Sequence, residues 1–416
     1  MDLSAWLERL EQLHPSAIDL GLARCGEVAR RLKLLNTAAT TITVAGTNGK
    51  GSTVAVMEAI LCASGVQVGA FTSPHLIRYN ERIRVDGVEV SDELIVEAFQ
   101  AIDQARSAIS LTYFEFNTLA ALWIFKKLDV AFQLLEVGLG GRLDAVNIID
   151  ADVAVVTAIG LDHQEWLGAD VETIAAEKCG IARNGRTCII ADAAAPSSVF
   201  TELFRIGANQ ILALRDYEYD DSHFESSGGG SISWRLPAGI IHMNAAAGLR
   251  ALEAASVGIY EDIVETAMEG LVLNGRRESQ RFGNIDVILD VAHNPDAAMA
   301  LRKFLDCRAT ERPTTAIFAV MSDKDCRGMI VEVEAVIDEW YLPAGIGGVR
   351  GQSPEIIADF ISGTAHVKPS FESAFEDAFG SLPDGGRLVI FGSFFAVGEG
   401  MKTLECMRLS RRDGQL

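Results

Sequence analysis

One short segment restricts the fold more than any other part of the chain. Residues 41–53 read TITVAGTNGKGST, which is a β-branched apolar run, a glycine-rich turn and the start of a helical pattern. Glycines at such a turn let a phosphate approach the main chain, where N–H groups of the turn and of the helix N-terminus point at it. Lys50 adds a cation for the β- and γ-phosphates, and Ser52 or Thr53 adds a hydroxyl near Mg²⁺. The segment predicts a phosphate loop between a buried strand and a helix.

The match to the common pattern G-x-x-x-x-G-K-[ST] is incomplete. Position 44 is Val where that pattern has Gly, and Gly51 follows the lysine. A plain glycine-rich turn is therefore the alternative interpretation. We favour the phosphate loop because strand, turn, lysine, hydroxyl and helix occur together.

Short apolar runs alternate with helical stretches over the rest of the chain. Strands are expected at 41–45, 67–72, 130–137, 153–159 and 187–191, and helices at 51–64, 91–109, 114–127 and 171–182. This alternation predicts an α/β protein, with a doubly wound, mostly parallel sheet domain followed by a smaller Rossmann-like α/β domain. We expect the first domain at 1–273, a polar linker at 274–284 and the second domain at 285–416. The acidic, Gly/Ser-rich stretch 216–235 is expected to form a surface hairpin or loop.

The charge balance excludes some classes of partner. The chain of 416 residues has 57 acidic and 36 basic residues, a formal net charge of −21. A surface that negative repels nucleic acids and anionic membranes. The N-terminal residues have charges throughout and no apolar leader, and seven scattered cysteines form no C-x-x-C pair. We therefore expect reduced thiols and a cytoplasmic protein, with neither nucleic acid nor membrane as partner.

Polar residues follow the predicted strands. Glu136 ends one strand at the edge where open α/β sheets bind ligands, and a carboxylate beside a phosphate loop suits Mg²⁺. Asp162 and His163 follow the next strand, and His163 could bind a metal or a phosphate. Lys178 lies in a predicted helix. Each residue alone also has a structural explanation: an acid capping a loop, a structural histidine or a solvated lysine.

Six motifs occur in a specific order along the chain. They are GTNGKGS (46–52), FTSPHL (71–76), EVGLGGRLDAVN (136–147), LDHQEWLG (161–168), EKCGI (177–181) and DVAHNP (290–295). Together they resemble the folylpolyglutamate synthase/dihydrofolate synthase family, a branch of the Mur-ligase-like ATP-dependent amide ligases. The resemblance extends from about residue 20 to about residue 400.

The resemblance implies a reaction in three steps. ATP phosphorylates a pterin-linked carboxylate, the amine of L-glutamate attacks the acyl phosphate, and phosphate leaves. ATP is the co-substrate and two Mg²⁺ ions are expected. The residues that match ATP-binding positions of the family are Gly49, Lys50, Gly51, Ser52, Asn244, Arg276 and Asp290. Those that match its magnesium ligands are Ser73, Glu136 and His163.

Catalytic roles are expected for Lys50, Glu136, His163 and Lys178, and Lys178 matches a lysine that is carbamylated in relatives. His293 resembles part of the same ATP site, to which both domains contribute. Chemically, one lysine and two Mg²⁺ would neutralise the charge on the transferred phosphoryl group. Other cations expected to give the site a local positive potential are Arg82, Arg142 and Arg276.

The resemblance also implies a dihydropteroate site. Two segments match it, and their residues are Thr112, Tyr113, Phe114, Glu115, Leu143, Asp144 and Ala145. Tyr113 and Phe114 could offer an aromatic face for a flat pterin, although they could also simply be core at the start of a helix. This match favours an enzyme with both activities, adding L-glutamate to dihydropteroate and to tetrahydrofolate or its polyglutamates.

Three alternatives remain. The enzyme could have folylpolyglutamate synthase activity alone, or it could be a Mur-type ligase acting on a cell-wall precursor. Gly51 in GKGS and the FTSPHL segment favour the folate branch. A nucleotide-dependent switch that binds a partner protein is the third, and Glu136, His163 and Asp290 together argue against it. Relatives of this kind are usually monomers, which is the expectation here.

Overall fold

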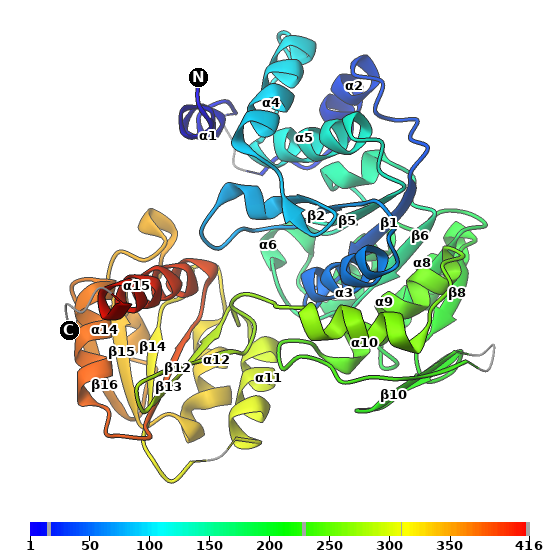
Figure 1. Cartoon of the computed structure of the whole chain (residues 1–416). Helices are drawn as coiled ribbons and strands as arrows, with labels where there is room; N and C mark the ends of the chain where they lie inside the picture. The colour runs from blue at the N-terminus through cyan, green and yellow to red at the C-terminus, as the bar shows by residue number, and fades with distance from the viewer. Residues whose placement is uncertain (15–17, 227–229, 309, 413–416) are drawn as a thin grey trace. The chain divides into compact units, whose positions relative to one another are not determined.

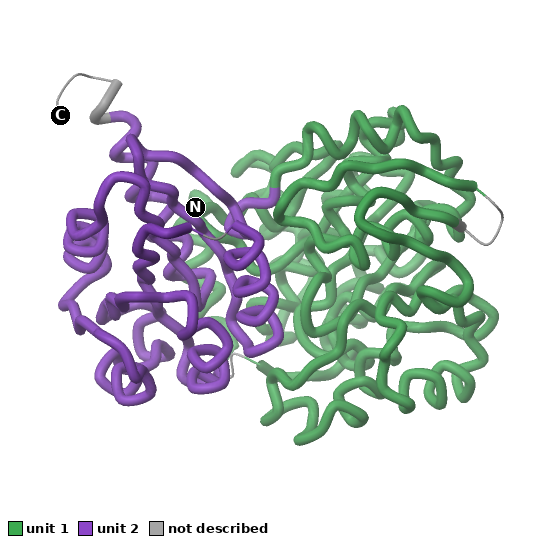
Figure 2. The backbone as a smooth tube through the Cα atoms, turned by 90° about the horizontal axis from the view of Figure 1, so that it is seen from below, with its two compact units in different colours: residues 1–272 green, residues 273–416 purple. Residues whose placement is uncertain are grey.

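The computed structural model describes residues 1–14, 18–226, 230–308 and 310–412 (Figure 1). The chain contains two compact units. Figure 2 colours unit 1, Met1–Val272, and unit 2, Leu273–Leu416. No helix among the described residues has both the length and the apolar character that a membrane crossing requires. All seven cysteines are free thiols.

Unit 1 is built on an eight-stranded sheet with strand order β4-β3-β2-β5-β1-β6-β7-β8. Six strands are parallel, namely β1 (Thr40–Ala45), β2 (Val68–Phe71), β5 (Phe132–Glu136), β6 (Val153–Val156), β7 (Thr187–Ile190) and β8 (Asn209–Leu212). A hairpin adds the antiparallel edge strands β3 (Ile83–Val85) and β4 (Val88–Glu89).

Helices cover both faces of this sheet. They are α1 (Leu3–Glu11), α2 (Ala23–Arg31), α3 (Lys50–Ala63), α4 (Asp92–Arg106), α5 (Tyr113–Lys127), α6 (Gln164–Leu167), α7 (Val171–Cys179), α8 (Ser197–Ile206), α9 (His242–Ala254) and α10 (Glu261–Gly270), with short 3₁₀ turns η1 (Tyr79–Arg82) and η2 (Ala145–Ile148). One core cluster joins α4, α5, α7 and α8 to alternate strand residues such as Phe71, Leu135 and Val156. Their neighbours along the strands are equally buried, because α3 and α9 pack on this face of the sheet. Helix α10 packs in turn against α3.

The stretch 216–235, expected as a hairpin or loop, contains a small antiparallel sheet. Its strands are β9 (Tyr217–Tyr219), β10 (His223–Ser226) and β11 (Ser231–Ser233), and the central strand β10 pairs with both others. Residues 227–229 lie outside the described part of the chain.

Unit 2 contains a six-stranded sheet of order β12-β13-β17-β14-β15-β16, and all but β12 are parallel. Its strands are β12 (Glu278–Phe282), β13 (Ile285–Asp290), β14 (Thr314–Phe318), β15 (Glu339–Pro343), β16 (Thr364–Lys368) and β17 (Arg387–Phe391). Its helices are α11 (Pro295–Asp306), α12 (Cys326–Val333), α13 (Pro354–Ala358), α14 (Phe371–Ser381) and α15 (Phe394–Arg412), with short turns η3 (Glu334–Val336) and η4 (Gly348–Arg350). The predicted α/β class, with a mostly parallel sheet in each domain, is confirmed.

The predicted linker 274–284 differs from the structure. It includes β12, which pairs with β13 along its whole length. The strand alternates between half-buried and exposed residues because it lies at the edge of the sheet. That polarity resembles a linker in the sequence, although the segment belongs to unit 2.

Candidate active site

The phosphate loop, residues 46–52, connects β1 to α3. Gly49 is the residue before the helix and has φ +92°, a left-handed conformation that favours glycine. Lys50 begins the helix, and its Nζ donates to the carbonyl oxygens of Gly46 at 3.1 Å and Thr47 at 3.2 Å. The loop thus holds the ammonium group of Lys50 beside the N-terminus of α3, and helix N-termini favour anions.

The loop is tied to the segment that follows β6. Thr47 Oγ1 donates to Gly160 O at 3.0 Å, and Thr157 Oγ1 donates to Asn48 O at 2.8 Å. That segment continues to His163, whose backbone N–H donates to Asp162 Oδ1 at 2.8 Å. His163 is the residue before α6 and has φ +52°, so its backbone also has the left-handed conformation.

A buried carboxylate lies beside the first turn of α3. Glu136 ends β5, and its Oε2 accepts the backbone N–H of Ser73 at 3.1 Å. A Cβ atom on Gly51 would lie 3.5 Å from the same oxygen. The structure therefore brings together Gly51, Glu136 and Ser73, three positions that the sequence analysis selected from three motifs.

Lys178 reaches the same loop from α7. Its side chain is buried, and its Nζ donates to Gly46 O at 2.9 Å, the oxygen that also accepts from Lys50. Burial, and next the nearby charge of Lys50, lower the pKa of Lys178 to about 7. The alternative of a solvated helix lysine is therefore wrong. At neutral pH a large fraction of this amine is uncharged and nucleophilic.

Asn244 of α9 lies against the phosphate loop. A Cβ atom on Gly49 would lie only 2.4 Å from Asn244 Oδ1, so this position needs glycine for space as well as for its backbone angle. Asn244 is buried, and its Oδ1 has no hydrogen-bond partner. A buried polar atom without a partner is costly, and one beside a phosphate loop suits a ligand that donates a hydrogen bond.

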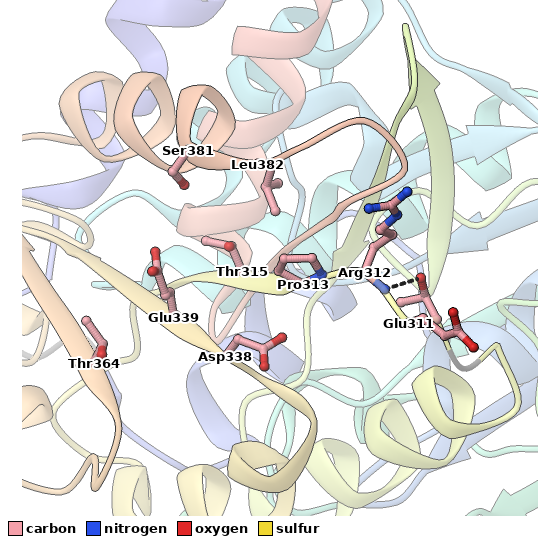
Figure 3. A pocket seen from close by; sticks show the side chains of 10 residues that line it. Glu311, Arg312, Pro313, Thr315, Asp338, Glu339, Thr364, Ser381 and Leu382 are labelled. Atoms are coloured by element: carbon pink, nitrogen blue, oxygen red, sulfur yellow. Dashed lines mark hydrogen bonds between the residues drawn. The ribbon is translucent and has the colours of Figure 1, made fainter.

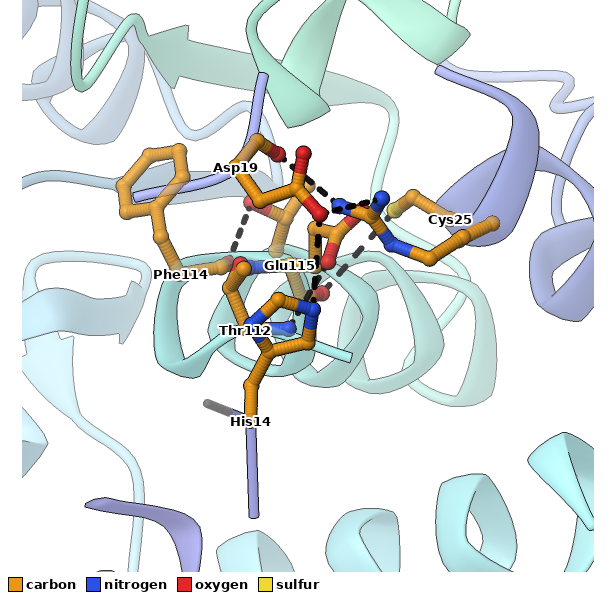
Figure 4. Close-up of polar contacts among 8 residues, drawn as sticks. His14, Asp19, Cys25, Thr112, Phe114 and Glu115 are labelled. Carbon is orange, nitrogen blue, oxygen red and sulfur yellow. Dashed lines mark hydrogen bonds and ion pairs between the residues drawn. The ribbon is translucent and has the colours of Figure 1, made fainter. Parts of the chain in front are cut away.

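The first segment expected to hold dihydropteroate begins α5. Thr112 Oγ1 accepts from Glu115 N at 3.2 Å, and Glu115 Oε2 accepts from Thr112 N at 2.7 Å, which is a capping box. Glu115 is buried and its Oε1 accepts from Arg24 Nη2 at 3.2 Å. Asp19 pairs with the same guanidinium at 2.7 Å, and His14 lies 3.4 Å from the Asp19 carboxylate (Figure 4). These contacts fix Glu115 in place.

Sequence reasoning missed Arg24 and Asp19. Both belong to the N-terminal part of unit 1, where no motif pointed to a site. The only available signal was Arg24 near the start of the amphipathic helix α2.

The two aromatic residues of this segment have different neighbours. The Phe114 ring occupies the space beside Gly138, where a Cβ atom would lie 2.5 Å from the ring. Tyr113 is half-buried, and its ring lies 5.6 Å from the Arg82 guanidinium carbon. Both side chains are partly accessible, and both also pack against the core of unit 1.

The second segment is organised by Asp144. Its Oδ2 accepts from the backbone N–H of Gly138 at 3.1 Å and Leu139 at 2.9 Å, and its Oδ1 accepts from Val146 N at 3.0 Å. Burial raises the pKa of Asp144 to about 6 against these hydrogen bonds. Leu143 is half-buried and Ala145 is buried on either side. Asp144 thus shapes the loop with both carboxylate oxygens.

Three predicted residues belong to unit 2 and lie together near one end of its sheet. Asp290 ends β13, and its carboxylate accepts from Arg277 N at 2.9 Å and Ala292 N at 2.7 Å. Burial raises the pKa of Asp290, and the neighbouring arginines oppose this rise. Arg276 and His293 both contact the Phe394 ring, at 5.7 Å and 6.0 Å. The predicted cation Arg142, in contrast, is exposed and pairs with Glu177 at 2.6 Å.

A cavity of about 480 Å³ in unit 2 lies elsewhere. Its lining includes Thr315, Glu339 and Thr364 (Figure 3). These residues lie at or near the amino ends of β14, β15 and β16. Ligands of open α/β sheets bind at the carboxyl ends, so this cavity is not a candidate active site.

The metal prediction is compatible with the donors that are present. Within the described ranges no three His, Cys, Asp or Glu side chains group as a metal site. The predicted set of Ser73, Glu136 and His163 has only two side chains of those types, and Ser73 adds a hydroxyl, so two of its three donors are oxygens. Such oxygen donors suit Mg²⁺, which keeps several water or phosphate ligands.

Known proteins are similar to this chain over nearly its full length. The family described as Mur ligase, glutamate ligase domain, matches residues 275–394. The dihydrofolate synthase/folylpolyglutamate synthase of Escherichia coli (strain K12) is 39% identical over 420 residues, which cover 98% of this chain and 96% of that protein.

Solved structures agree over nearly the full length. E. coli FolC in complex with DHPP and ADP has a TM-score of 0.94 and 38% identity, covering 98% of this chain and 99% of that chain. A bifunctional folylpolyglutamate synthase/dihydrofolate synthase with Mn, AMPPNP and L-glutamate bound has a TM-score of 0.91 and 37% identity, covering 97% and 98%. The chain therefore belongs to the dihydrofolate synthase/folylpolyglutamate synthase family.

Proposed function

We propose that this protein is an ATP-dependent ligase that joins L-glutamate to dihydropteroate, giving dihydrofolate, and to tetrahydrofolate or its polyglutamates. The observation that carries the proposal is the convergence at the phosphate loop. Lys50 and Lys178 share Gly46 O, and Glu136 lies beside Gly51. Full-length membership of a family with both activities in its name supports the choice of substrates.

The chemistry begins with phosphoryl transfer. A carboxylate oxygen of the acid attacks the γ-phosphorus of ATP, giving an acyl phosphate and ADP. The glutamate amine then attacks the acyl carbon, phosphate leaves with the former carboxylate oxygen, and the amine loses a proton. Lys50 and the N–H groups of the loop would hold the phosphates and stabilise the charge that develops on them.

Magnesium would supply charge neutralisation for this transfer. We propose that Ser73, Glu136 and His163 hold two Mg²⁺ ions together with ATP. The buried carboxylate of Glu136 and the adjacent Ser73 support this assignment. We also propose that three residues of unit 2 contribute to binding ATP, namely Arg276, Asp290 and His293.

We further propose that Lys178 is carbamylated. A neutral amine adds to CO₂ and releases one proton, and the lowered pKa of Lys178 favours the neutral form. The carbamate nitrogen retains one hydrogen, so it can still donate to Gly46 O. A ¹³C carbamate resonance that appears with ¹³C-bicarbonate and is absent from Lys178→Met is the expected result. Its absence from the wild-type protein would contradict the modification.

A substrate panel tests the function. ADP release is measured with dihydropteroate, tetrahydrofolate or a UDP-muramoyl acid, each with and without its amino acid, and products are identified by mass spectrometry. We expect glutamate-dependent ADP release and a new amide with both pterins. Activity with tetrahydrofolate alone would indicate the monofunctional alternative. Activity only with the muramoyl acid, or ADP release without an amide product, would contradict the proposal.

A further inference from the structure

Arg82 is a buried cation without a carboxylate partner. It ends η1 and is only 8% exposed. Its Nε donates to His75 Nδ1 at 2.8 Å. No carboxylate among the described residues lies within ion-pair distance of this guanidinium, and its two Nη atoms donate to none of these residues. Neither Nη is among the fully buried unpaired atoms, so both remain open to solution.

Arg84, two residues further along the chain, shows the usual arrangement, in which an arginine pairs with a carboxylate. Its guanidinium donates to both oxygens of Glu58, with Nη2 at 2.6 Å from Oε2. The carboxylate next to Arg82 in sequence, Glu81, is already used, because it accepts three backbone N–H groups of residues 76–78. A buried charge is costly unless it is paired. The structure thus leaves Arg82 available for an external anion.

Two tyrosine rings flank Arg82, and one of them contacts an amide that has an unused donor. The Arg82 guanidinium carbon lies 5.6 Å from the Tyr113 ring and 6.0 Å from the Tyr79 ring. Tyr79 OH donates to Asn117 Oδ1 at 2.9 Å, while the buried Asn117 Nδ2 has no partner. Two aromatic faces and a fixed Nε hold the guanidinium with its two Nη atoms unused. That geometry matches a carboxylate, which Arg binds through two parallel hydrogen bonds.

The position of Arg82 indicates which carboxylate it meets. Ser73, in the same segment, contacts Glu136 beside the phosphate loop, where the acid would be phosphorylated. Tyr113 belongs to the segment assigned to the pterin substrate. Arg82 therefore lies in the part of unit 1 that we assign to the acid substrate. A folate differs from dihydropteroate in this respect, since its terminal glutamate has an α-carboxylate in addition to the γ-carboxylate that is activated.

We propose that Arg82 binds the α-carboxylate of the terminal glutamate of folate substrates, and so serves tetrahydrofolate glutamylation more than dihydropteroate glutamylation. This proposal rests on the proposed function. It makes Arg82 a specificity-determining residue, because the selected carboxylate exists in only one of the two acid substrates.

The test compares Arg82→Gln with Arg78→Gln. Arg78 is in the same segment, but its side chain is 63% exposed and its partner is Glu89. Loss of a charge-assisted pair predicts a KM for tetrahydrofolate that rises about 10- to 100-fold in Arg82→Gln. The KM for dihydropteroate should rise much less, and Arg78→Gln should resemble the wild type with both acids.

Arg82→Lys keeps a charge but loses the paired geometry, and it is expected to give the same ordering of the two acids with a smaller effect. It replaces the glutamine variant if circular dichroism shows that variant to be unfolded. Equal losses with both acids, or a raised KM for L-glutamate alone, would overturn the proposal. If the wild-type protein glutamylates neither acid, the proposed function fails instead, so the two failures are distinguishable.

Discussion

Replacing Lys178 with methionine tests the cost of the buried amine. The pKa of this group falls from 10.5 to about 7 on folding, and each unit corresponds to about 1.4 kcal/mol. Because the charged form is disfavoured in the folded state, the penalty is almost absent above pH ~10.5, about 3 kcal/mol at pH 8 and roughly 5 kcal/mol well below pH 7. Methionine has similar length and no charge, so the variant avoids this penalty.

The variant also loses one hydrogen bond, to Gly46 O, at a cost of about 1 kcal/mol. That oxygen keeps Lys50 Nζ as a donor, so no buried carbonyl is left without a partner. We therefore expect Lys178→Met to be more stable than the wild type by about 2 kcal/mol at pH 8 and about 4 kcal/mol at pH 6. Its ligase activity should fall at least about 10-fold, because the group at the phosphate loop is lost.

The assay is urea unfolding in CO₂-free buffer at pH 6, 8 and 10, followed by circular dichroism. Lys126→Met is the matched control, since that exposed lysine donates to the carbonyl of Lys33 and its replacement should not stabilise the protein as Lys178→Met does. A Lys178→Met variant that is no more stable than the wild type at any pH would refute the reasoning. A gain in the stability of Lys178→Met over the wild type that increases towards pH 10 would also refute the reasoning.

Three further changes probe the phosphate loop and its neighbours. Lys50→Ala should keep the fold by circular dichroism but lower ADP formation more than about 100-fold, and normal turnover would remove Lys50 from phosphate binding. Gly49→Ala forces an alanine into the left-handed backbone conformation, at a cost of about 1–2 kcal/mol, and places its Cβ atom against Asn244. Calorimetry should therefore show weaker ATP binding, and an unchanged affinity would contradict this packing. Gly138→Ala displaces the Phe114 ring; its KM for dihydropteroate should rise more than its KM for ATP, and the reverse order would contradict the assignment.

Much of the framework follows from local patterns. The strand, turn and helix at 41–53 could be predicted because apolar β-branched residues, glycines and a lysine occur at the spacing of a phosphate loop. The start of the helix expected at 91–109 also depends on a local contact, since the Ser91 side chain accepts from Leu94 N. The edge strand β12 could not be recognised, because exposed edge residues are polar and resemble a linker.

The site was harder to predict than the fold. Taken by itself, Lys178 was more plausible as a solvated residue, because a helical pattern does not reveal which side chains are buried. The burial of Lys178 depends on the packing of α7 against the phosphate loop. The guanidinium of Arg24 beside Glu115 depends on two segments 91 residues apart. Long-range contacts of this kind leave no periodic signal in one sequence.

The acyl phosphate is the centre of the account, and an isotope measurement tests it directly. Dihydropteroate with an ¹⁸O-labelled carboxylate is incubated with the enzyme, Mg²⁺, ATP and L-glutamate, and the released inorganic phosphate is analysed by mass spectrometry. The account predicts one ¹⁸O atom in each phosphate released, because the attacking carboxylate oxygen leaves with phosphorus. Amide product accompanied by phosphate without ¹⁸O would contradict it.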